Sequence, residues 1–290
     1  MPEMPEVESL ARWLDQRTKG LSFARLDILA ISALKTYDPP VSALVGQKVS
    51  GWSRRGKYLI CSTDQGLFLC VHLARAGWIR WTDDQTSGPA KLTKGPQALR
   101  VAFDDGSGFT ATEAGTDKRL SVHIVRSPDD VVNIATLGVE VLSPEFTVDR
   151  FAEILGSQGR SQVKGVLVDQ SIIAGIGNAY SDEALHAAKL SPFTPASSVV
   201  GDRVVLTALH SAIRLVLNDA LARSEGKPAA ELKDSKRSGM RVHGRTGHLC
   251  PVCGDVVREV AFASKSLQYC AKCQTGGKPL ADRRLSKLLK

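Results

Sequence analysis

The chain has 290 residues, 43% of them apolar, and a formal net charge of +8, which suits two folded domains with a small appendage. We find no apolar run long enough to cross a membrane. The acids and prolines at the N-terminus are not the basic and apolar residues of a signal peptide. We therefore expect a cytoplasmic monomer that makes no contact with a membrane.

The first seven residues contain two Pro-Glu pairs. Removal of Met1 would leave Pro2 with a secondary amine, and an α-amino group has a pKa of about 8, against about 10.4 for lysine. Such an amine is partly neutral near pH 7 and can attack an electrophilic carbon to form an iminium. Glu3 and Glu6 would then transfer protons at the same centre. The alternative is structural, because Pro and Glu are common in the first turn of a helix.

A helix and then a run of strands are predicted for the first 130 residues. Val7, Leu10, Ala11 and Leu14 recur at helical spacing before Gly20. Short apolar segments separated by turn residues then predict six or seven strands of an antiparallel sandwich or barrel. Their expected ranges are residues 23–30, 48–54, 58–63, 67–73, 78–81, 99–103 and 120–125.

Helical periodicity dominates the following part of the chain. After a linker over residues 127–144, helices are expected from residue 147, over 162–168, over 179–188 and over 202–221, and then a polar loop over 224–239. The glycines of the 174–178 segment precede Asn178, which could cap a helix whose first amides bind phosphate. A plain helical hairpin turn fits this segment equally well.

Four of the six cysteines form two Cys-x2-Cys pairs, namely Cys250, Cys253, Cys270 and Cys273. This spacing is typical of one structural Zn²⁺ held by four thiolates. Disulfides are the competing interpretation, but they belong to oxidising compartments. The metal would hold together a small module with little core of its own.

The positive charge is concentrated at the C-terminal end. Residues 223–290 contain 15 Lys/Arg and 6 Asp/Glu, a local charge of +9, so the rest of the chain carries −1. Such a concentration favours a polyanionic partner, most simply nucleic acid. A basic surface that serves only solubility is the alternative.

Taken in order, these motifs resemble the formamidopyrimidine-DNA glycosylase and endonuclease VIII (Fpg/Nei) family of DNA repair enzymes. The matching segments are residues 2–8, 55–59, 72–73 with Gly77, 137–138, 169–170, 175–180 with Glu183, and 242–245 leading into the four cysteines. They span nearly the whole chain. Each segment is modest by itself, and the ordered set is very specific.

The resemblance implies a role for each matching residue. Pro2 is similar to the family's nucleophile, which attacks C1′ of a damaged nucleotide, while Glu3 resembles its acid/base and Glu6 a further carboxylate of the site. Lys57 resembles a phosphate-gripping lysine that also belongs to the catalytic set. The remaining DNA contacts implied are His72, Lys164 and Asn178, with Lys265 where the family has an arginine. Lysine keeps that charge but loses the two-pronged hydrogen bonding of a guanidinium.

The residues that fill the gap left by a flipped base depart from the formamidopyrimidine branch. Its methionine falls on Arg75, and its Arg-x-Phe pair falls near Arg119 and Leu120 with one residue fewer. Arg75 and Leu120 remain candidate wedges. The segment between Leu232 and Val242 is shorter than that branch's lesion-covering loop, whereas Met4 resembles the same branch. Oxidised purine and oxidised pyrimidine substrates therefore both stay open.

These observations predict an α+β, multi-domain protein with an N-terminal helix and antiparallel β-sandwich, a helix–two-turn–helix domain and a four-cysteine zinc finger. The expected domains are residues 1–130, a linker over 131–146, 147–240, the zinc finger over 241–275, and a basic tail over 276–290. The predicted function is a bifunctional DNA glycosylase and AP lyase of base excision repair. Its partner would be double-stranded DNA with an oxidised base or abasic site. A non-catalytic damage-binding protein on the same scaffold is the alternative.

Overall fold

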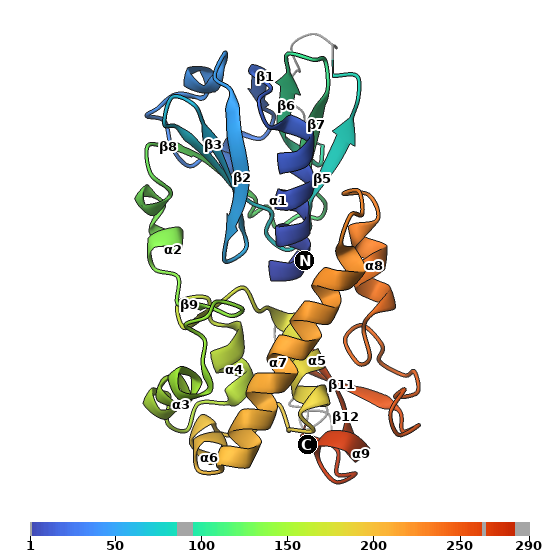
Figure 1. Ribbon diagram of the computed structural model, residues 1–290. Coiled ribbons are helices and arrows are strands. Elements are labelled where there is room, and N and C mark those ends of the chain that lie inside the picture. The colour runs from blue at the N-terminus through green and yellow to red at the C-terminus, as the bar shows by residue number, and fades with distance from the viewer. Residues whose placement is uncertain (1, 86–94, 263–264, 282–290) are drawn as a thin grey trace. The chain divides into compact units, whose positions relative to one another are not determined.

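The computed structural model describes residues 2–85, 95–262 and 265–281. Its internal contacts divide the chain into two units. The first unit comprises Met1–Thr136 with Ser224–Asp234, and the second comprises Leu137–Arg223 with Ser235–Lys290. Figure 1 colours the chain from the N-terminal helix α1 in blue to the C-terminal hairpin in red.

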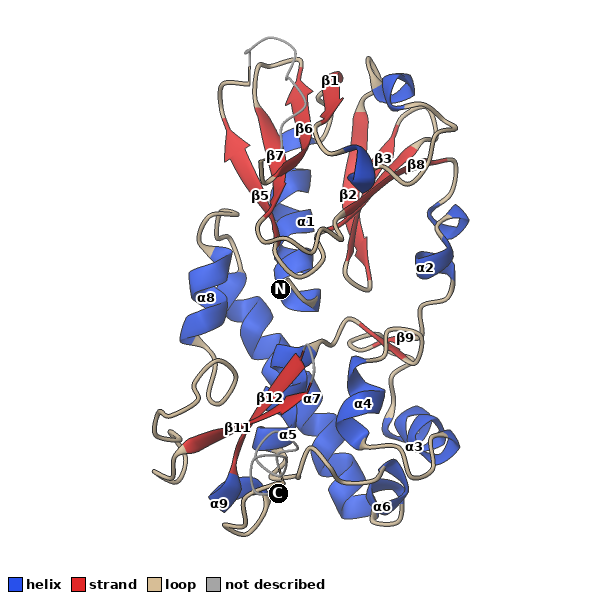
Figure 2. Ribbon diagram, turned by 180° about the vertical axis from the view of Figure 1, so that it is seen from behind, coloured by secondary structure: helices blue, strands red, loops and turns tan. Residues whose placement is uncertain are grey.

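The first unit contains two four-stranded antiparallel sheets (Figure 2). One sheet has the order β1 (Phe23–Ile28), β6 (Gln97–Phe103), β7 (Gly108–Glu113) and β5 (Gly77–Thr82). The other has the order β2 (Val49–Arg55), β3 (Tyr58–Thr63), β4 (Phe68–His72) and β8 (Ser121–Val125). The predicted sandwich is confirmed, while β7 was not predicted because its Gly-Phe-Thr-Ala-Thr-Glu sequence lacks a run of large apolar residues.

Short helical turns lie between β1 and β2 and after β8, the last strand of the first unit. They are η1 (Ile31–Ala33), η2 (Val41–Leu44), η3 (Pro128–Asp130) and α2 (Val132–Ala135). None contains more than four residues, so the sheets and α1 provide the framework of this unit.

Helix α1 (Met4–Thr18) is fixed against strand β2. Its apolar side contributes Val7, Leu10 and Leu14 to the core of the unit, as the helical spacing predicts. Trp52 forms two bonds to it: its backbone N–H donates to Asp15 Oδ1 at 2.8 Å and its indole Nε1–H to Thr18 Oγ1 at 2.9 Å. These bonds set the rotation of α1 and thereby the position of its N-terminal end.

A second segment of the first unit comes from much later in the chain. Trp78 Nε1–H donates to the carbonyl oxygen of Ala229 at 2.9 Å, and both Ala229 and Leu232 lie in the core of this unit. The prediction of a loop over residues 224–239 is wrong at its end, where α8 (Leu232–Ser238) forms. Apart from Leu232, this helix is polar and basic, so its sequence carries no apolar periodicity to predict it.

The second unit is helical at its centre. Its elements are β9 (Val139–Glu140), α3 (Val148–Ser157), α4 (Val163–Val168), β10 (Ile173–Ala174), α5 (Asn178–Ala187), α6 (Ala196–Val200) and α7 (Arg203–Ser224), with β9 and β10 paired in parallel. Thr147 caps α3, its Oγ1 accepting the Arg150 N–H at 3.1 Å. The helices predicted over residues 162–168, 179–188 and 202–221 are thus present with shifts of a few residues at their ends.

Helix α7 is long and apolar enough, by length and composition alone, to cross a membrane, which differs from the prediction that the chain has no such run. The structure gives a different reason for its apolar character. Leu206, Leu209, Ile213 and Leu217 are buried along one side. Their spacing of three or four residues is that of a helix with one side in a protein core.

A β-hairpin with a short helix follows α8. It consists of β11 (Val257–Phe262), β12 (Lys265–Cys270) and α9 (Ala271–Gln274). Two small apolar clusters surround it: Val257 packs with Val242 and the cysteines, and Val260, Leu267 and Tyr269 pack with Phe193. Of the predicted basic tail, residues 282–290 lie outside the described residues.

Candidate functional site

The predicted nucleophile and its two carboxylates lie together at the start of α1. Pro2, Glu3 and Glu6 are all buried. The Glu3 N–H donates to Glu6 Oε2 at 2.8 Å, and the Glu3 side chain in turn accepts the Glu6 N–H. Both carboxylates therefore cap the helix, the structural role weighed above, and both lie within a few residues of the proline.

Arg54 links the turn that carries Lys57 to the first turns of α1. Its Nε donates to Glu8 Oε2 at 3.1 Å, and its Nη1 donates to the carbonyl oxygen of Gly56 at 2.8 Å. Gly56 and Lys57 form the two-residue loop between β2 and β3, and Gly56 has the positive φ of 55° that such a loop requires. Arg54 therefore holds this turn against the first turns of α1, and Lys57 itself is buried.

His72, at the end of β4, stands opposite Tyr58, and their ring centroids lie 4.7 Å apart. Burial, followed by the positive charges of Lys57 and His123, lowers the pKa of His72 to about 4. The imidazole is therefore neutral at pH 7 and offers one N–H to a partner such as a phosphate. The structure supports a hydrogen-bonding rather than a charged role for this side chain.

Arg75 lies in a tight turn after β4. Ala74 takes a left-handed conformation with φ of 52°, and the Gly77 N–H donates to the carbonyl oxygen of Leu73 at 2.8 Å. A Cβ on Gly77 would lie only 1.9 Å from that oxygen, so only glycine fits. This backbone leaves the Arg75 side chain exposed, as a predicted wedge requires.

The second predicted wedge is not available. Leu120 is 2% exposed and belongs to the core of the first unit, so the structure contradicts its assignment to DNA. Arg119 is exposed and pairs with Asp117 at 2.9 Å. The buried Glu113, which was not predicted as a site residue, accepts the backbone N–H groups of both Arg119 and Leu120 at 2.9–3.0 Å. It therefore fixes the loop that presents Arg119.

Lys164 also differs from its prediction as a DNA contact. It is 9% exposed, and its Nζ donates to Asp182 Oδ1 at 2.6 Å, to Ser181 Oγ at 2.7 Å and to the carbonyl oxygen of Asn178 at 3.2 Å. These three acceptors all belong to the first turns of α5. The geometry supports a role in positioning that helix rather than in binding DNA directly.

Asn178 is the first residue of α5, with Gly177 in the capping position, one residue earlier than expected. Its Nδ2 donates to the carbonyl oxygen of Ser266 in β12 at 2.7 Å. The helix terminus and the hairpin are therefore joined at the residue predicted to bind phosphate. Lys265 precedes Ser266 at the start of β12, and its side chain lies outside what the structure describes.

The four predicted zinc ligands converge in the hairpin. Cys253 and Cys270 have their sulfur atoms 3.3 Å apart, and those of Cys250 and Cys273 are 3.9 Å apart. Thiolates around one tetrahedral Zn²⁺ at about 2.3 Å would lie about 3.8 Å from one another. The donor set and its spacing therefore fit a structural Zn²⁺, which would hold the two knuckles together when bound.

Comparison with known families follows the same order of domains. The chain matches the formamidopyrimidine-DNA glycosylase N-terminal domain over residues 1–117, the formamidopyrimidine-DNA glycosylase H2TH domain over 137–230, and the zinc finger found in FPG and IleRS over 247–276. The chain belongs to the formamidopyrimidine-DNA glycosylase family. It is accordingly a DNA repair glycosylase with a structural zinc finger, and the predicted Fpg/Nei resemblance is confirmed.

Individual members of the family are similar over very different lengths. The formamidopyrimidine-DNA glycosylase of Roseiflexus sp. (strain RS-1) is 32% identical, covering 94% of this chain and all of the relative. An uncharacterized formamidopyrimidine-DNA glycosylase-like protein of Mycobacterium tuberculosis is 59% identical over 53% of this chain and 94% of its own. The solved structure of MutM in complex with carbocyclic 8-oxo-G containing DNA aligns with a TM-score of 0.81 at 26% identity, covering 94% of this chain and all of that chain.

Three further polar residues of this glycosylase were not assigned a role from the sequence. Asp182 Oδ2 accepts from His243 Nδ1 at 2.7 Å, and the buried Glu183 accepts the N–H groups of Arg241, Val242 and His243 at 2.8–2.9 Å. These bonds hold residues 241–243, the segment that leads into the zinc module, against α5. Glu183 and residues 242–245 occur in the family motifs, so that signal was present in the sequence without a stated partner.

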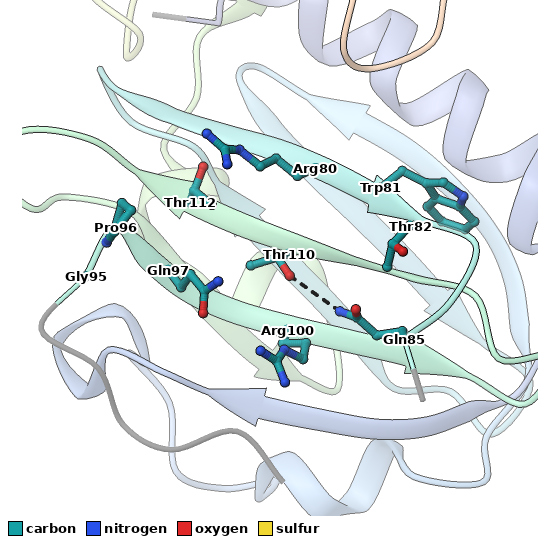
Figure 3. A pocket seen from close by; sticks show the side chains of 10 residues that line it. All are labelled: Arg80, Trp81, Thr82, Gln85, Gly95, Pro96, Gln97, Arg100, Thr110 and Thr112. Atoms are coloured by element: carbon teal, nitrogen blue, oxygen red, sulfur yellow. Dashed lines mark hydrogen bonds between the residues drawn. The ribbon is translucent and has the colours of Figure 1, made fainter. Parts of the chain in front are cut away.

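A concave pocket of about 500 Å³ lies elsewhere in the first unit, over strands β5, β7 and β6 (Figure 3). Arg80, Thr110 and Arg100 stand in register across these strands, and Gln85 Nε2 donates to Thr110 Oγ1 at 3.4 Å. None of the predicted site residues is among the ten that line it. The pocket and the N-terminal candidate site are therefore distinct.

Proposed function

We propose that this glycosylase is bifunctional and that Pro2 performs both base removal and strand cleavage at oxidised bases in double-stranded DNA. The observation that carries the proposal is the arrangement at the start of α1. There the buried Glu3 and Glu6 flank the Pro2 position, and Arg54 holds the Lys57 turn beside the same helix. A helix cap alone has no need of a buried lysine on a neighbouring turn.

The chemistry would proceed in two stages. After removal of Met1, the Pro2 nitrogen attacks C1′, and the C1′–N bond to the base breaks as the base leaves with a proton. The ring oxygen O4′ then takes a proton, the sugar opens, and C1′ and the proline nitrogen form an iminium. Loss of a C2′ proton expels the 3′ phosphate, and water hydrolyses the iminium to release the enzyme. Glu3 would carry these protons, and Glu6 would hold Glu3 in place.

The damaged nucleotide must leave the base stack before this attack, because its C1′ is hidden inside the duplex. Flipping the nucleotide costs a few kcal/mol, which phosphate contacts can offset. We assign those contacts to Lys57, His72, Arg119, Asn178 and Lys265, with Arg75 as the wedge. The MutM relative, solved with 8-oxo-G containing DNA, supports an oxidised base as substrate.

Borohydride trapping tests the nucleophile. The wild-type chain, incubated with a duplex carrying one oxidised base, should give a covalent complex whose peptide map places the adduct on Pro2. Pro2→Gly, or a variant that retains Met1, should lose trapping. Pro5→Ala, a change at the neighbouring buried proline of α1, should keep it. Normal trapping with Met1 in place would remove Pro2 from the mechanism.

Two further measurements define the substrate and the binding. A panel of duplexes, each with one oxidised purine or pyrimidine, would rank the bases by single-turnover excision rate. Affinity for an abasic-site analogue should fall with salt, with a log–log slope near −0.9 for each phosphate neutralised. If the protein binds these duplexes tightly but cleaves none of them, the non-catalytic alternative is the one that remains.

A further inference from the structure

A histidine from α5 faces the zinc ligands. His186 is 2% exposed, and its Nε2 lies 3.3 Å from Cys250 Sγ. Among the described residues, His186 Nε2 and the sulfur atoms of Cys250, Cys270 and Cys273 all lie within 4.8 Å of one another. The predicted four-thiolate site therefore has a fifth potential donor, supplied by a helix outside the zinc module.

The coordination number decides what this histidine does. Structural Zn²⁺ is almost always four-coordinate, and the four cysteines already supply four thiolates at suitable spacing. His186 is then left outside the coordination shell, at hydrogen-bonding distance from one ligand. Four thiolates on Zn²⁺ carry a net charge of −2, so a nearby N–H donor is favourable.

The surroundings of the ring decide where its proton lies. Nδ1 of His186 is buried and has no hydrogen-bond partner among the described residues. A proton on Nδ1 would be a buried donor without an acceptor, which costs about 1–3 kcal/mol. The proton therefore belongs on Nε2, where it points toward the Cys250 sulfur.

We propose that His186 donates an Nε2–H hydrogen bond to the zinc-bound thiolate of Cys250 and so fastens the metal centre to helix α5. The same helix contacts the zinc module through three other residues. Asn178 bonds Ser266, Asp182 bonds His243 and the Gln268 N–H, and Glu183 bonds the backbone of residues 241–243. Of these four residues of α5, His186 is the one that lies at hydrogen-bonding distance from a zinc ligand. Its hydrogen bond stabilises the negative charge of the Cys250 thiolate in the zinc-loaded site, so the zinc affinity is higher.

Zinc transfer from the full-length, zinc-loaded protein to a chromogenic chelator tests this role. His186→Leu removes the donor, whereas His186→Gln keeps an N–H near the position of Nε2. His210→Leu is the matched control, since His210 is a buried histidine of the same unit whose Nε2 bonds the Phe146 carbonyl oxygen at 2.8 Å. We expect a zinc affinity about 10–100-fold weaker in His186→Leu and near wild type in the other two.

Two outcomes of that experiment would overturn the proposal. Retention of wild-type zinc affinity by His186→Leu would make His186 a packing residue only. Equal zinc loss in His186→Leu and His186→Gln would show that the ring's shape, not its N–H, is what matters.

The hydrogen bond can also be tested in the wild-type protein, where a folding defect of a variant cannot confuse the result. Two-bond ¹⁵N–¹H correlation spectra of the zinc-loaded chain report which ring nitrogen of each histidine carries the proton. We expect His186 to be neutral with its proton on Nε2. A proton on Nδ1 would refute the hydrogen bond, because Nε2 would then be a bare acceptor or a direct zinc ligand. A cobalt-substituted sample should likewise show the absorption of four thiolates, and bands typical of three thiolates and one imidazole would contradict the assignment.

Discussion

Lys164 Nζ and Asp182 Oδ1 lie 2.6 Å apart, with side chains that are 11% and 0% exposed. A lysine buried this deeply against a carboxylate is held by its partner, and Asp182 is shared with His243. The contacts of Asp182 with Lys164 and His243 thus join α4, α5 and the segment that leads to the zinc module. This arrangement leaves Lys164 a structural cation.

Replacement of Lys164 by methionine should therefore destabilise the second unit. Asp182 would keep a buried charge without its ammonium partner, a loss of about 3–5 kcal/mol, which chemical denaturation would detect. The salt dependence of DNA affinity should keep its slope in this variant. A log–log slope smaller by about one would instead mean that Lys164 neutralises a phosphate.

Arg54→Ala should slow single-turnover base excision more than it reduces stability. The change frees the Gly56 carbonyl oxygen and one oxygen of Glu8, so Lys57 loses its fixed place beside α1. If the loss of these hydrogen bonds, about 1–3 kcal/mol together, is expressed fully in the transition state, the rate falls about 5–160-fold.

Arg12 provides the control for Arg54, because it pairs with the other oxygen of the same Glu8 at 2.8 Å from an exposed position. An exposed pair four residues apart on a helix contributes only about 0.3–0.5 kcal/mol. Arg12→Ala should leave the excision rate near wild type. Equal losses of excision rate in the two variants would show that Arg54 acts by positioning Glu8 rather than the turn that carries Lys57.

His72 should make stability depend on pH. Its pKa is lowered to about 4 in the folded chain, against an ordinary value of 6.5. The unfolded chain therefore binds the proton between these values while the folded chain does not, so stability is highest above pH 6.5 and falls as the pH drops toward 4. The loss is on the order of 1–3 kcal/mol.

Urea unfolding at a series of pH values from 7.5 to 4.5 measures this dependence. His72→Gln, which cannot be protonated, should flatten the part of the curve between pH 6.5 and 4. The exposed His248 offers a control, and its replacement by glutamine should leave the curve unchanged. An unaltered pH dependence in His72→Gln would be evidence against a buried, neutral imidazole.

In the turn that presents Arg75, glycine in place of Ala74 should leave stability nearly unchanged, whereas alanine in place of Gly77 should lower it. Ala74→Gly removes a left-handed alanine and should change the free energy of unfolding by less than about 1 kcal/mol, in the stabilising direction. Gly77→Ala places a Cβ against the Leu73 carbonyl oxygen and should destabilise by more than about 2 kcal/mol. Thermal unfolding compares the two, and a harmless Gly77→Ala would contradict the described turn.

Local patterns were enough to predict the zinc ligands, α1 and α5, because cysteine spacing and helical periodicity are written in neighbouring residues. They failed where a partner lies far away in the sequence. Lys164 and Leu120 were assigned to DNA by motif position, yet one pairs with Asp182 and the other enters the core. The residues next to Lys164 and Glu113 in the sequence do not predict which distant groups these two side chains will contact.

The bond from Trp78 to Ala229 spans 151 positions of the chain. This contact affects how the first unit folds during translation and whether it can be expressed as a fragment. A nascent first unit lacks part of its interior until the ribosome has made both α7 and the residues after it, so its completion waits for most of the polypeptide. A fragment cut after residue 136 would leave the space of Ala229 and Leu232 empty, and the N-terminal half is therefore a poor choice for expression by itself.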